Sequence, residues 1–388
     1  MKNIVSTQII VGAFLGMMSL ASCDNAEYSP LEDQAFIMQT NTNPNTTMKV
    51  FIDQEEVHTD INVRLLNLAS EDCKYELVED QQLLDKFNKE NYTTYQFLTH
   101  DQYQMSTHQV TVKAGKSISD PTSLNIKPLT REMKDSGDKY AVALTLKSLD
   151  NQTEILRPGS NIIYLLDPAI VTSVPVFSPQ NNASFTLSEE QSWGEWSVEF
   201  CVNMSVLGKK VGEMNNQAIF DASSNLGEED GQIYIRFGDA PIEGNRLQIK
   251  TQGSQMNSRT LFEANKWYHI AFVCTGSKLH LYVDGKLDNT QDMPGKVTNL
   301  GTRVKIGNTD WLKADVQMSE LRMWSRALSQ REVENNMYST APDANGLYAY
   351  FKLNEGQGKD FKDATGHGNV GKFDNEVWKS NVRLNSKN

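Results

Sequence analysis

Short runs in which apolar and polar residues alternate recur along most of this chain, and turn residues bound each run. The clearest run is 196–202, WSVEFCV, whose apolar residues at every second position would share one face. Alternation with a period of two indicates a strand that is buried on one side. Because such strands are stable only in sheets that pack against each other, the pattern predicts an all-β fold made of sandwiches.

The sequence specifies one turn in detail. Asp284 and Gly285 directly follow the apolar run 279–283 and precede Lys286. A two-residue hairpin loop needs positive φ at both positions, and an Asp-Gly pair tolerates that conformation. We therefore expect a tight hairpin centred on these two residues.

Helical patterns are confined to two short segments. Residues 80–91 carry apolar side chains three and four positions apart, which is typical of a helix with one buried face. Ser329 and Glu332 form a capping box, which predicts a second helix that ends near Met337.

Prolines mark a boundary near the middle of the chain. Pro168, Pro175 and Pro179 are followed by the pair Asn181 and Asn182, and prolines at this density do not suit a central strand. A first strand at 35–38 is one alternative for the end of the polar N-terminal segment. The predicted division is a signal peptide over 1–22, a tether over 23–47, an immunoglobulin-like sandwich over 48–170, a linker over 171–183 and a jelly-roll sandwich over 184–388.

The N-terminus resembles the leader of a bacterial lipoprotein. Lys2 precedes the apolar stretch 9–20, which is shorter than the roughly 20 residues of a membrane span. The sequence Leu-Ala-Ser-Cys over 20–23 resembles a lipobox, which implies cleavage before Cys23 and lipidation of its thiol. The alternative is a secretory leader with an incidental cysteine.

The acidic segment after Cys23 resembles the surface-export signal of lipoproteins from Gram-negative gut anaerobes. This resemblance implies a protein anchored by lipid in the outer membrane and exposed at the cell surface. A simple solvated linker is the alternative for the same residues, and the orientation on the membrane stays open.

Charge and cysteine content exclude other classes. The formal net charge is −12, whereas nucleic-acid binding needs clustered Lys and Arg. A neutral glycan is a better partner for such a chain than a strongly acidic one. Cys73, Cys201 and Cys274 form no CxxC motif, so neither a zinc site nor a disulfide framework is predicted. A disulfide between Cys201 and Cys274 stays open.

The first domain resembles the immunoglobulin-like domain of unknown function at the N-terminus of many glycan-utilisation surface lipoproteins. In that family the domain serves mainly as a spacer or platform. The segments that carry the resemblance are 62–65, 75–78, 103–105, 112–115 and 140–144.

The second domain resembles a laminin-G-like, concanavalin A-like jelly roll. Members of that family bind glycans or proteins, so the resemblance implies a fold more than a function. The segments that carry it, in family order, are 266–272, 281–285, 320–329, 347–358 and 363–369.

No catalytic residues are predicted. Glucanases of this architecture carry two or three carboxylates that alternate on one strand, so that acid and nucleophile face one cleft. Here Glu199 and Glu320 each stand alone on a strand. Cofactors are not expected, with one structural calcium at Asp363 as an alternative. Ser319 stands where the family often has Asp, which weakens the case for a metal, and Asp363 could instead cap its own turn.

Ligand-binding residues are expected where an aromatic ring lies in a polar loop. The apolar face of a sugar packs on a ring while its hydroxyls bind polar groups at the rim. Trp311 lies in a polar loop with Asn308 and Asp310, and Trp193 is the second candidate. For both tryptophans the alternative is a ring that folds over the edge of the sandwich.

These features favour a non-catalytic surface lipoprotein that binds a polysaccharide or oligosaccharide for a glycan-uptake system. An outer-membrane glycan transporter complex would be its partner. The alternatives are a surface adhesion or protein-interaction module, and a glycoside hydrolase with an unrecognised site.

Overall fold

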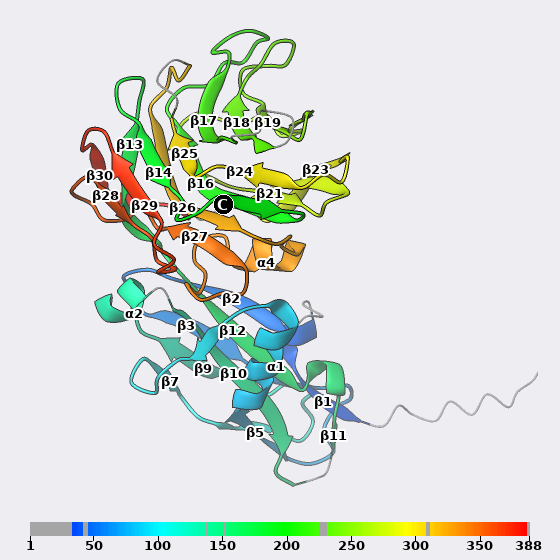
Figure 1. Cartoon of the computed structure of the whole chain (residues 1–388). Helices are drawn as coiled ribbons and strands as arrows, with labels where there is room; N and C mark the ends of the chain where they lie inside the picture. The colour runs from blue at the N-terminus through cyan, green and yellow to red at the C-terminus, as the bar shows by residue number, and fades with distance from the viewer. Residues whose placement is uncertain are drawn as a thin grey trace, which may run out of the picture.

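The computed structural model describes residues 33–41, 46–136, 138–150, 153–224, 231–307 and 311–385. In these residues two β-rich domains follow each other along the chain, as Figure 1 shows. The all-β prediction is confirmed. The predicted leader and Cys23 lie outside the described residues. No helix within these ranges is long and apolar enough to cross a membrane.

The N-terminal domain is a sandwich whose core lies between one large sheet and two small ones. The large sheet consists of β2 (Thr47–Ile52), β12 (Asn161–Pro168), β10 (Lys139–Ser148), β5 (Cys73–Glu79) and β8 (Gln109–Val112), with β6 (Tyr95–Phe97) paired to β10. The small sheets are β3 (Val57–Ile61), β9 (Thr122–Ile126) and β7 (Tyr103–Met105), and β11 (Glu154–Ile155), β1 (Gln34–Ile37) and β4 (Val63–Leu65).

The first predicted helix is confirmed as α1 (Gln81–Asn91). Asp80 caps its N-terminus, since its Oδ1 accepts a hydrogen bond from the backbone N–H of Leu83 at 2.9 Å. Leu84 is fully buried against β10 and β12, so the helix covers the outer face of the large sheet. The remaining helices of this domain are α2 (Arg131–Ser136) and the 3-10 turns η1 (Met38–Asn41) and η2 (Arg157–Gly159).

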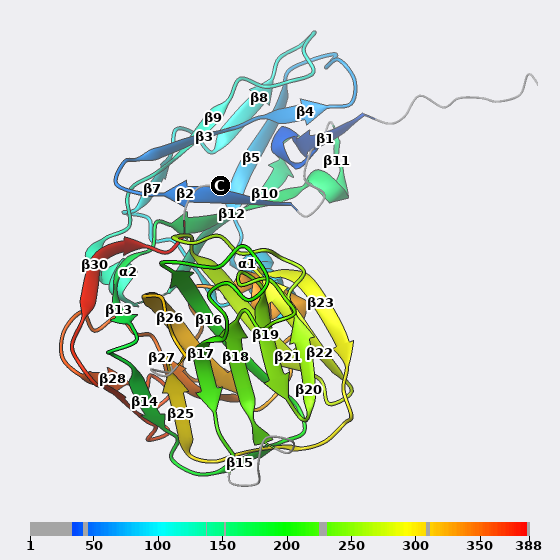
Figure 2. The ribbon, with the colours of Figure 1, turned by 90° about the horizontal axis from the view of Figure 1, so that it is seen from above.

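The C-terminal domain is a jelly roll of two packed eight-stranded sheets, which Figure 2 shows face on. The first sheet consists of β23 (Lys286–Asp292), β22 (Lys278–Val283), β21 (Tyr268–Cys274), β16 (Trp196–Met204), β26 (Val316–Trp324), β13 (Val171–Phe177) and β30 (Trp378–Arg383), with β27 (Leu347–Phe351) paired to β26. The second consists of β20 (Ser254–Asn257), β19 (Leu247–Thr251), β18 (Ile233–Phe237), β17 (Gln217–Ala222), β25 (Arg303–Ile306), β14 (Ala183–Thr186), β29 (Val370–Phe373) and β28 (Asp360–Lys362). A short pair, β15 (Gln191–Trp193) and β24 (Thr298–Leu300), lies beside them.

The two faces of β16, which the alternation predicted, lie in different surroundings. Trp196, Val198 and Phe200 belong to the core between the sheets. Glu199 and Cys201 point to the other face, yet they are buried as well, because α4 (Gln330–Asn335) and the segment after it cover that face. The predicted capping box of Ser329 and Glu332 is present at the start of α4.

Two predicted boundaries are wrong. The expected linker 171–183 is largely strand, since β13 pairs with both β26 and β30. Its register shifts between Thr172 and Val174, and such a bulge lets a sheet accommodate Pro175. The expected tether contains β1, which pairs with β4 and β11, so the alternative of a first strand at 35–38 is confirmed. Cys73, Cys201 and Cys274 are buried free thiols.

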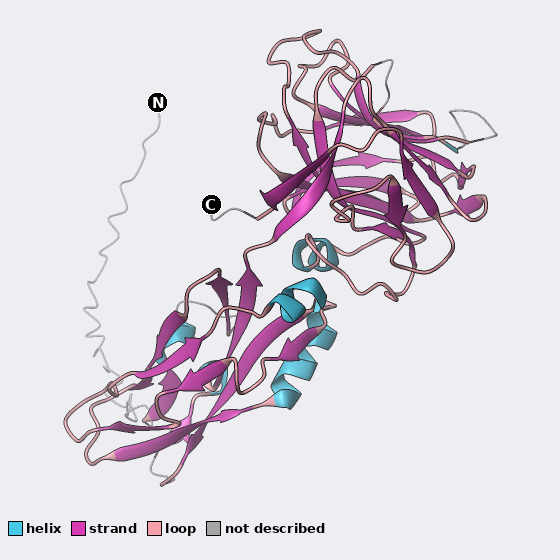
Figure 3. Ribbon diagram, turned by 90° about the vertical axis from the view of Figure 1, so that its left-hand side faces the viewer, coloured by secondary structure: helices cyan, strands magenta, loops and turns pink. Residues whose placement is uncertain are grey.

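Hydrogen bonds join the two domains on two sides of their junction. Helices lie at one of these sides (Figure 3), where α1 contacts α4. On the helical side, Asn335 and Asn336 donate to the carbonyls of Asn91 and Tyr92 at 3.2 and 3.3 Å. On the other side, the Asn385 amide donates to the Pro168 carbonyl at 2.8 Å and accepts from the Ile170 N–H at 2.7 Å.

The hairpin at Asp284 and Gly285 is confirmed, with φ values of 49° and 76°. A Cβ added at Gly285 would lie 2.9 Å from the Cα of Glu334 in α4, so this turn also fixes how closely the helix approaches. Gly366 has nearly the same φ, 75°, but open space around its missing Cβ.

Gly285→Ala should therefore lower the free energy of unfolding of the jelly roll more than Gly366→Ala does. Both variants carry the cost of a left-handed alanine, about 1 kcal/mol. Only Gly285→Ala adds the clash with α4, about 1–3 kcal/mol. Urea denaturation followed by tryptophan fluorescence measures this domain alone, since all 6 tryptophans lie in it. Equal losses of unfolding free energy in the two variants would show that α4 can move away from residue 285 at no measurable cost.

Candidate ligand-binding site

Trp311 is the predicted site residue that the structure exposes. Trp311 is 50 % exposed to solvent, although Leu312 and Ala314 just after it are buried. Leu312 and Ala314 insert into the core between the sheets, which leaves the indole to face outward. An exposed tryptophan on an anchored loop is a rigid apolar plane of the kind that sugars stack on.

The loop that carries Trp311 is fixed at its far end by the loop between β16 and β17. Ser205 and Asp315 exchange two hydrogen bonds of 2.9 Å. The β16–β17 loop also exposes Val206 and Val211. It lies at the top of Figure 1, on the side of the jelly roll away from the N-terminal domain.

The other predicted binding residues do not form a described site with Trp311. Asn308 and Asp310 lie outside the described residues. Trp193 has only 5 % of its surface exposed, and its ring packs edge-on against Tyr348 at 5.6 Å between centroids. The prediction that Trp193 presents a binding face is therefore wrong, because β15 folds its ring into the sandwich edge.

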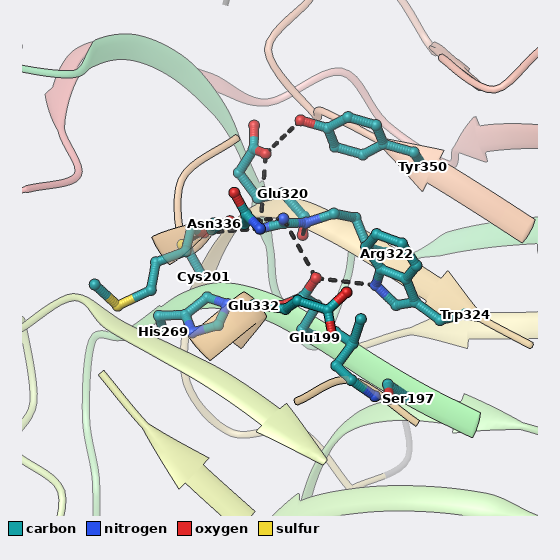
Figure 4. Close-up of polar contacts among 12 residues, drawn as sticks. Ser197, Glu199, Cys201, His269, Glu320, Arg322, Trp324, Glu332, Asn336 and Tyr350 are labelled. Carbon is teal, nitrogen blue, oxygen red and sulfur yellow. Dashed lines mark hydrogen bonds and ion pairs between the residues drawn. The ribbon is translucent and has the colours of Figure 1, made fainter. Parts of the chain in front are cut away.

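A buried polar network lies on the outer face of the first sheet (Figure 4), under α4 and the segment that follows it. Arg322 lies at its centre, with Nη1 at 3.3 Å from Glu199 Oε1. The same guanidinium donates to the carbonyls of Asn336 and Met337, at 2.7 and 2.8 Å, and so holds the segment after α4 against the sheet.

Two further groups complete the coordination of Glu199. His269 Nε2 lies 3.2 Å from one of its oxygens, and the indole N–H of Trp324 donates to the other at 2.9 Å. Burial raises the pKa of Glu199, but Arg322 and the two hydrogen bonds outweigh burial and leave that pKa below its ordinary value. Glu199 is thus a structural carboxylate that is held ionised.

Glu320 has a different electrostatic setting. It accepts a hydrogen bond from the Tyr350 hydroxyl at 2.5 Å, but Arg322 is 3.9 Å away. Burial raises the pKa of Glu320 to about 6, against the opposing effects of Arg322 and the Tyr350 hydrogen bond. Its backbone has φ of 58° at the point where the pairing of β16 and β26 shifts register.

Asp363 holds a turn through both carboxylate oxygens. Oδ1 accepts from the backbone N–H groups of Tyr350 and Thr365, each at 3.1 Å, and Oδ2 accepts from Asn369 at 2.9 Å. Within the described ranges, no cluster of three or more His, Cys, Asp or Glu side chains could hold a metal ion. The geometry of Asp363 fits the capping role that the sequence left open.

A second candidate is a cavity of about 540 Å³ between the two domains. It is lined by Tyr95 and Lys139 of the first domain, and by Glu320, Tyr338 and Tyr350 of the second. Burial lowers the pKa of Lys139 to about 7, with a smaller contribution from the charge of Arg322. No local sequence motif predicts this cavity, because its walls lie far apart in the sequence and meet only where the two domains are in contact.

Comparison with known proteins supports the two-domain division. Residues 31–153 match the model of a family of N-terminal domains, and residues 179–334 match that of the concanavalin A-like lectin/glucanases superfamily. No curated protein is similar enough to count as a relative.

Among solved structures, the chain resembles a Bacteroides ovatus protein to which carbohydrate binding has been assigned provisionally, with 19 % identity and a TM-score of 0.54 over 91 % of this chain and 100 % of that one. A heptameric pentraxin from Limulus polyphemus matches with 14 % identity and a TM-score of 0.36 over 52 % of this chain and 94 % of that one. EndoBT-3987 from Bacteroides thetaiotamicron, solved with a Man5GlcNAc product, has 15 % identity and a TM-score of 0.27 over 34 % of this chain and 30 % of that one.

The strand order and the matched model agree on the second domain, and the first is a β-sandwich of its own matched family. The chain is therefore a two-domain protein whose second domain, over residues 179–334, matches the concanavalin A-like lectin/glucanases superfamily.

Proposed function

We propose that this protein is a non-catalytic carbohydrate-binding protein whose jelly roll binds a neutral glycan through Trp311. The observation that carries the proposal is the half-exposed indole on a loop that buried neighbours and hydrogen bonds hold in place. A ring whose loop is anchored at the residues that follow it loses less entropy on binding than a ring on a mobile loop. The fold it shares with lectins supports the same ligand class.

The absence of catalysis is part of the proposal, and the setting of the carboxylates supports it. Glu199 and Glu320 both lie beside Arg322 in the first sheet, but both are buried. A glycosidase needs two carboxyl groups that flank the scissile bond of a bound sugar. Both carboxylate oxygens of Glu199 already bind Arg322, His269 or Trp324. Glu199 and Glu320 therefore suit a structural role.

We further propose that Cys23 carries the lipid anchor of an outer-membrane lipoprotein that faces outward and captures glycan for an uptake system with a membrane transporter. The lipobox-like sequence and the acidic residues that follow it support this placement. Two acyl signals or more give stable anchoring, which a lipidated N-terminal cysteine supplies.

Trp311→Ala should weaken binding of a neutral polysaccharide by about tenfold or more, as expected when a central tryptophan is removed from a binding surface. Affinity electrophoresis of the full chain against a panel of neutral polysaccharides measures the change. Leu287→Ala is the control, because Leu287 is equally exposed, at 49 %, on β23. Retention of full affinity by Trp311→Ala would contradict the proposed site, and release of reducing sugar by the wild type would contradict the absence of catalysis.

Glu320→Gln should change the pH dependence of stability in a defined direction. The folded state raises the pKa of Glu320 to about 6 from its ordinary 4.5, so the folded protein holds this proton more tightly than the unfolded chain. The stability that this proton gives is present below pH 4.5 and is lost as the pH rises through about 6.

The free energy of unfolding of Glu320→Gln, relative to the wild type, should therefore rise by about 2 kcal/mol between pH 4.5 and pH 7. Urea denaturation at the two pH values measures it. Glu334→Gln, a change on the exposed face of α4, should show no such trend. A relative stability that falls with pH would mean that Arg322 stabilises ionised Glu320.

A further inference from the structure

The cavity between the domains has the size of a small-molecule site. Its volume of about 540 Å³ lies within the roughly 300–1,000 Å³ of known ligand pockets, which often occur at domain interfaces. The first domain supplies one wall from β10, β12 and the segment around Tyr95, and the second supplies the other from β26, β27 and the segment after α4.

Hydrogen bonds on two sides of this cavity join the two domains that form its walls. The Lys139 ammonium donates to the Asn335 carbonyl at 2.6 Å and to the Asn336 side chain at 2.7 Å, and so links the first domain to the segment after α4. On the opposite side, Asn385 bridges to Pro168 and Ile170, and Arg383 Nη1 lies 3.4 Å from Asp53. A preformed cavity binds without the cost of rearranging its walls.

Groups with unused hydrogen-bonding capacity line the cavity. Within the part of the chain that the structure describes, the hydroxyls of Tyr95 and Tyr338 make no hydrogen bond. Both side chains are largely buried, and burial raises both of their pKa values. Each phenol can donate and accept one hydrogen bond, as a sugar hydroxyl can, while its ring offers an apolar face.

The charges around the cavity nearly balance, which argues against an ionic ligand. Four lysines and five carboxylates contribute to its lining. Lys139 is already bound to two oxygens, and Asp53 and Asp167 have partners in Arg383 and Asn385. A neutral ligand with many hydroxyl groups fits these surroundings best.

We propose that the cavity between the domains is a second binding site that takes a short neutral oligosaccharide or the end of a longer glycan chain. The ligand class rests on the proposed function, but the site does not involve Trp311. Tyr95 and Tyr338 hydrogen-bond the sugar from opposite domains, and Tyr350 of β27 flanks it together with Lys352, which follows that strand. Both domains therefore contribute to binding, which gives the first domain a role beyond that of a spacer.

Calorimetric titration of the full chain with maltotriose, cellotriose, mannotriose and xylotriose tests this site. Trp311→Ala should leave one class of binding site for the trisaccharide that binds the wild type. In that background, Tyr338→Phe and Tyr95→Phe should each weaken binding by about three- to tenfold, the loss of one hydrogen bond to an uncharged partner. Phenylalanine keeps each ring, and among the described residues neither hydroxyl has a protein partner whose loss would unfold the chain.

Tyr234→Phe is the matched control, since its hydroxyl pairs with Asn216 on the outer face of the second sheet, away from the cavity. If Trp311→Ala abolishes all binding and the cavity variants bind like the wild type, the second site is wrong while the proposed function stands. If only longer neutral polysaccharides bind the wild type, affinity electrophoresis compares the same variants, and unchanged binding by Tyr95→Phe and Tyr338→Phe overturns the cavity proposal. If no neutral glycan binds at all, the proposed function fails and the second site fails with it.

Discussion

The position of the second domain depends on the buried guanidinium of Arg322. It neutralises Glu199 inside the protein and holds two carbonyls of the segment after α4. Removing one partner of a buried ion pair costs about 3–5 kcal/mol, because the other charge stays buried without compensation. The segment it fixes carries Asn335 and Asn336, which join the first domain. One side chain thus connects the interior of the jelly roll to the junction between domains.

The same covering segment separates this jelly roll from an open sheet. Trp324 and Tyr350 point to the face that α4 covers, where they pack with Val333 instead of meeting solvent. Most of this face is therefore covered, and the proposed sites lie at the loops around Trp311 and at the part of the face that meets the first domain. Both locations gain rigidity from neighbouring elements, since the core fixes the Trp311 loop and hydrogen bonds fix the junction.

Local patterns in the sequence are sufficient to predict many of the strands, turns and helices, but not to predict which residues form the candidate site. Alternation predicted β16, and the Asp-Gly pair and the capping box predicted the hairpin and α4, because each depends on residues within a few positions. The same alternation could not reveal that Glu199 would be buried, since its cover comes from a segment more than 130 residues later. Trp193 looked exposed for a similar reason, and the cavity tyrosines come from different domains.

The place where the chain enters the first domain bears on how the protein would resist pulling. β1 lies toward the end away from the jelly roll (Figure 1) and pairs along three residues with β4 and two with β11. In the proposed lipoprotein, tension between a held glycan and the anchor would reach the fold through β1. Because so few residue pairs hold β1, the domain would yield first there, and the junction and both proposed binding sites would stay intact behind it.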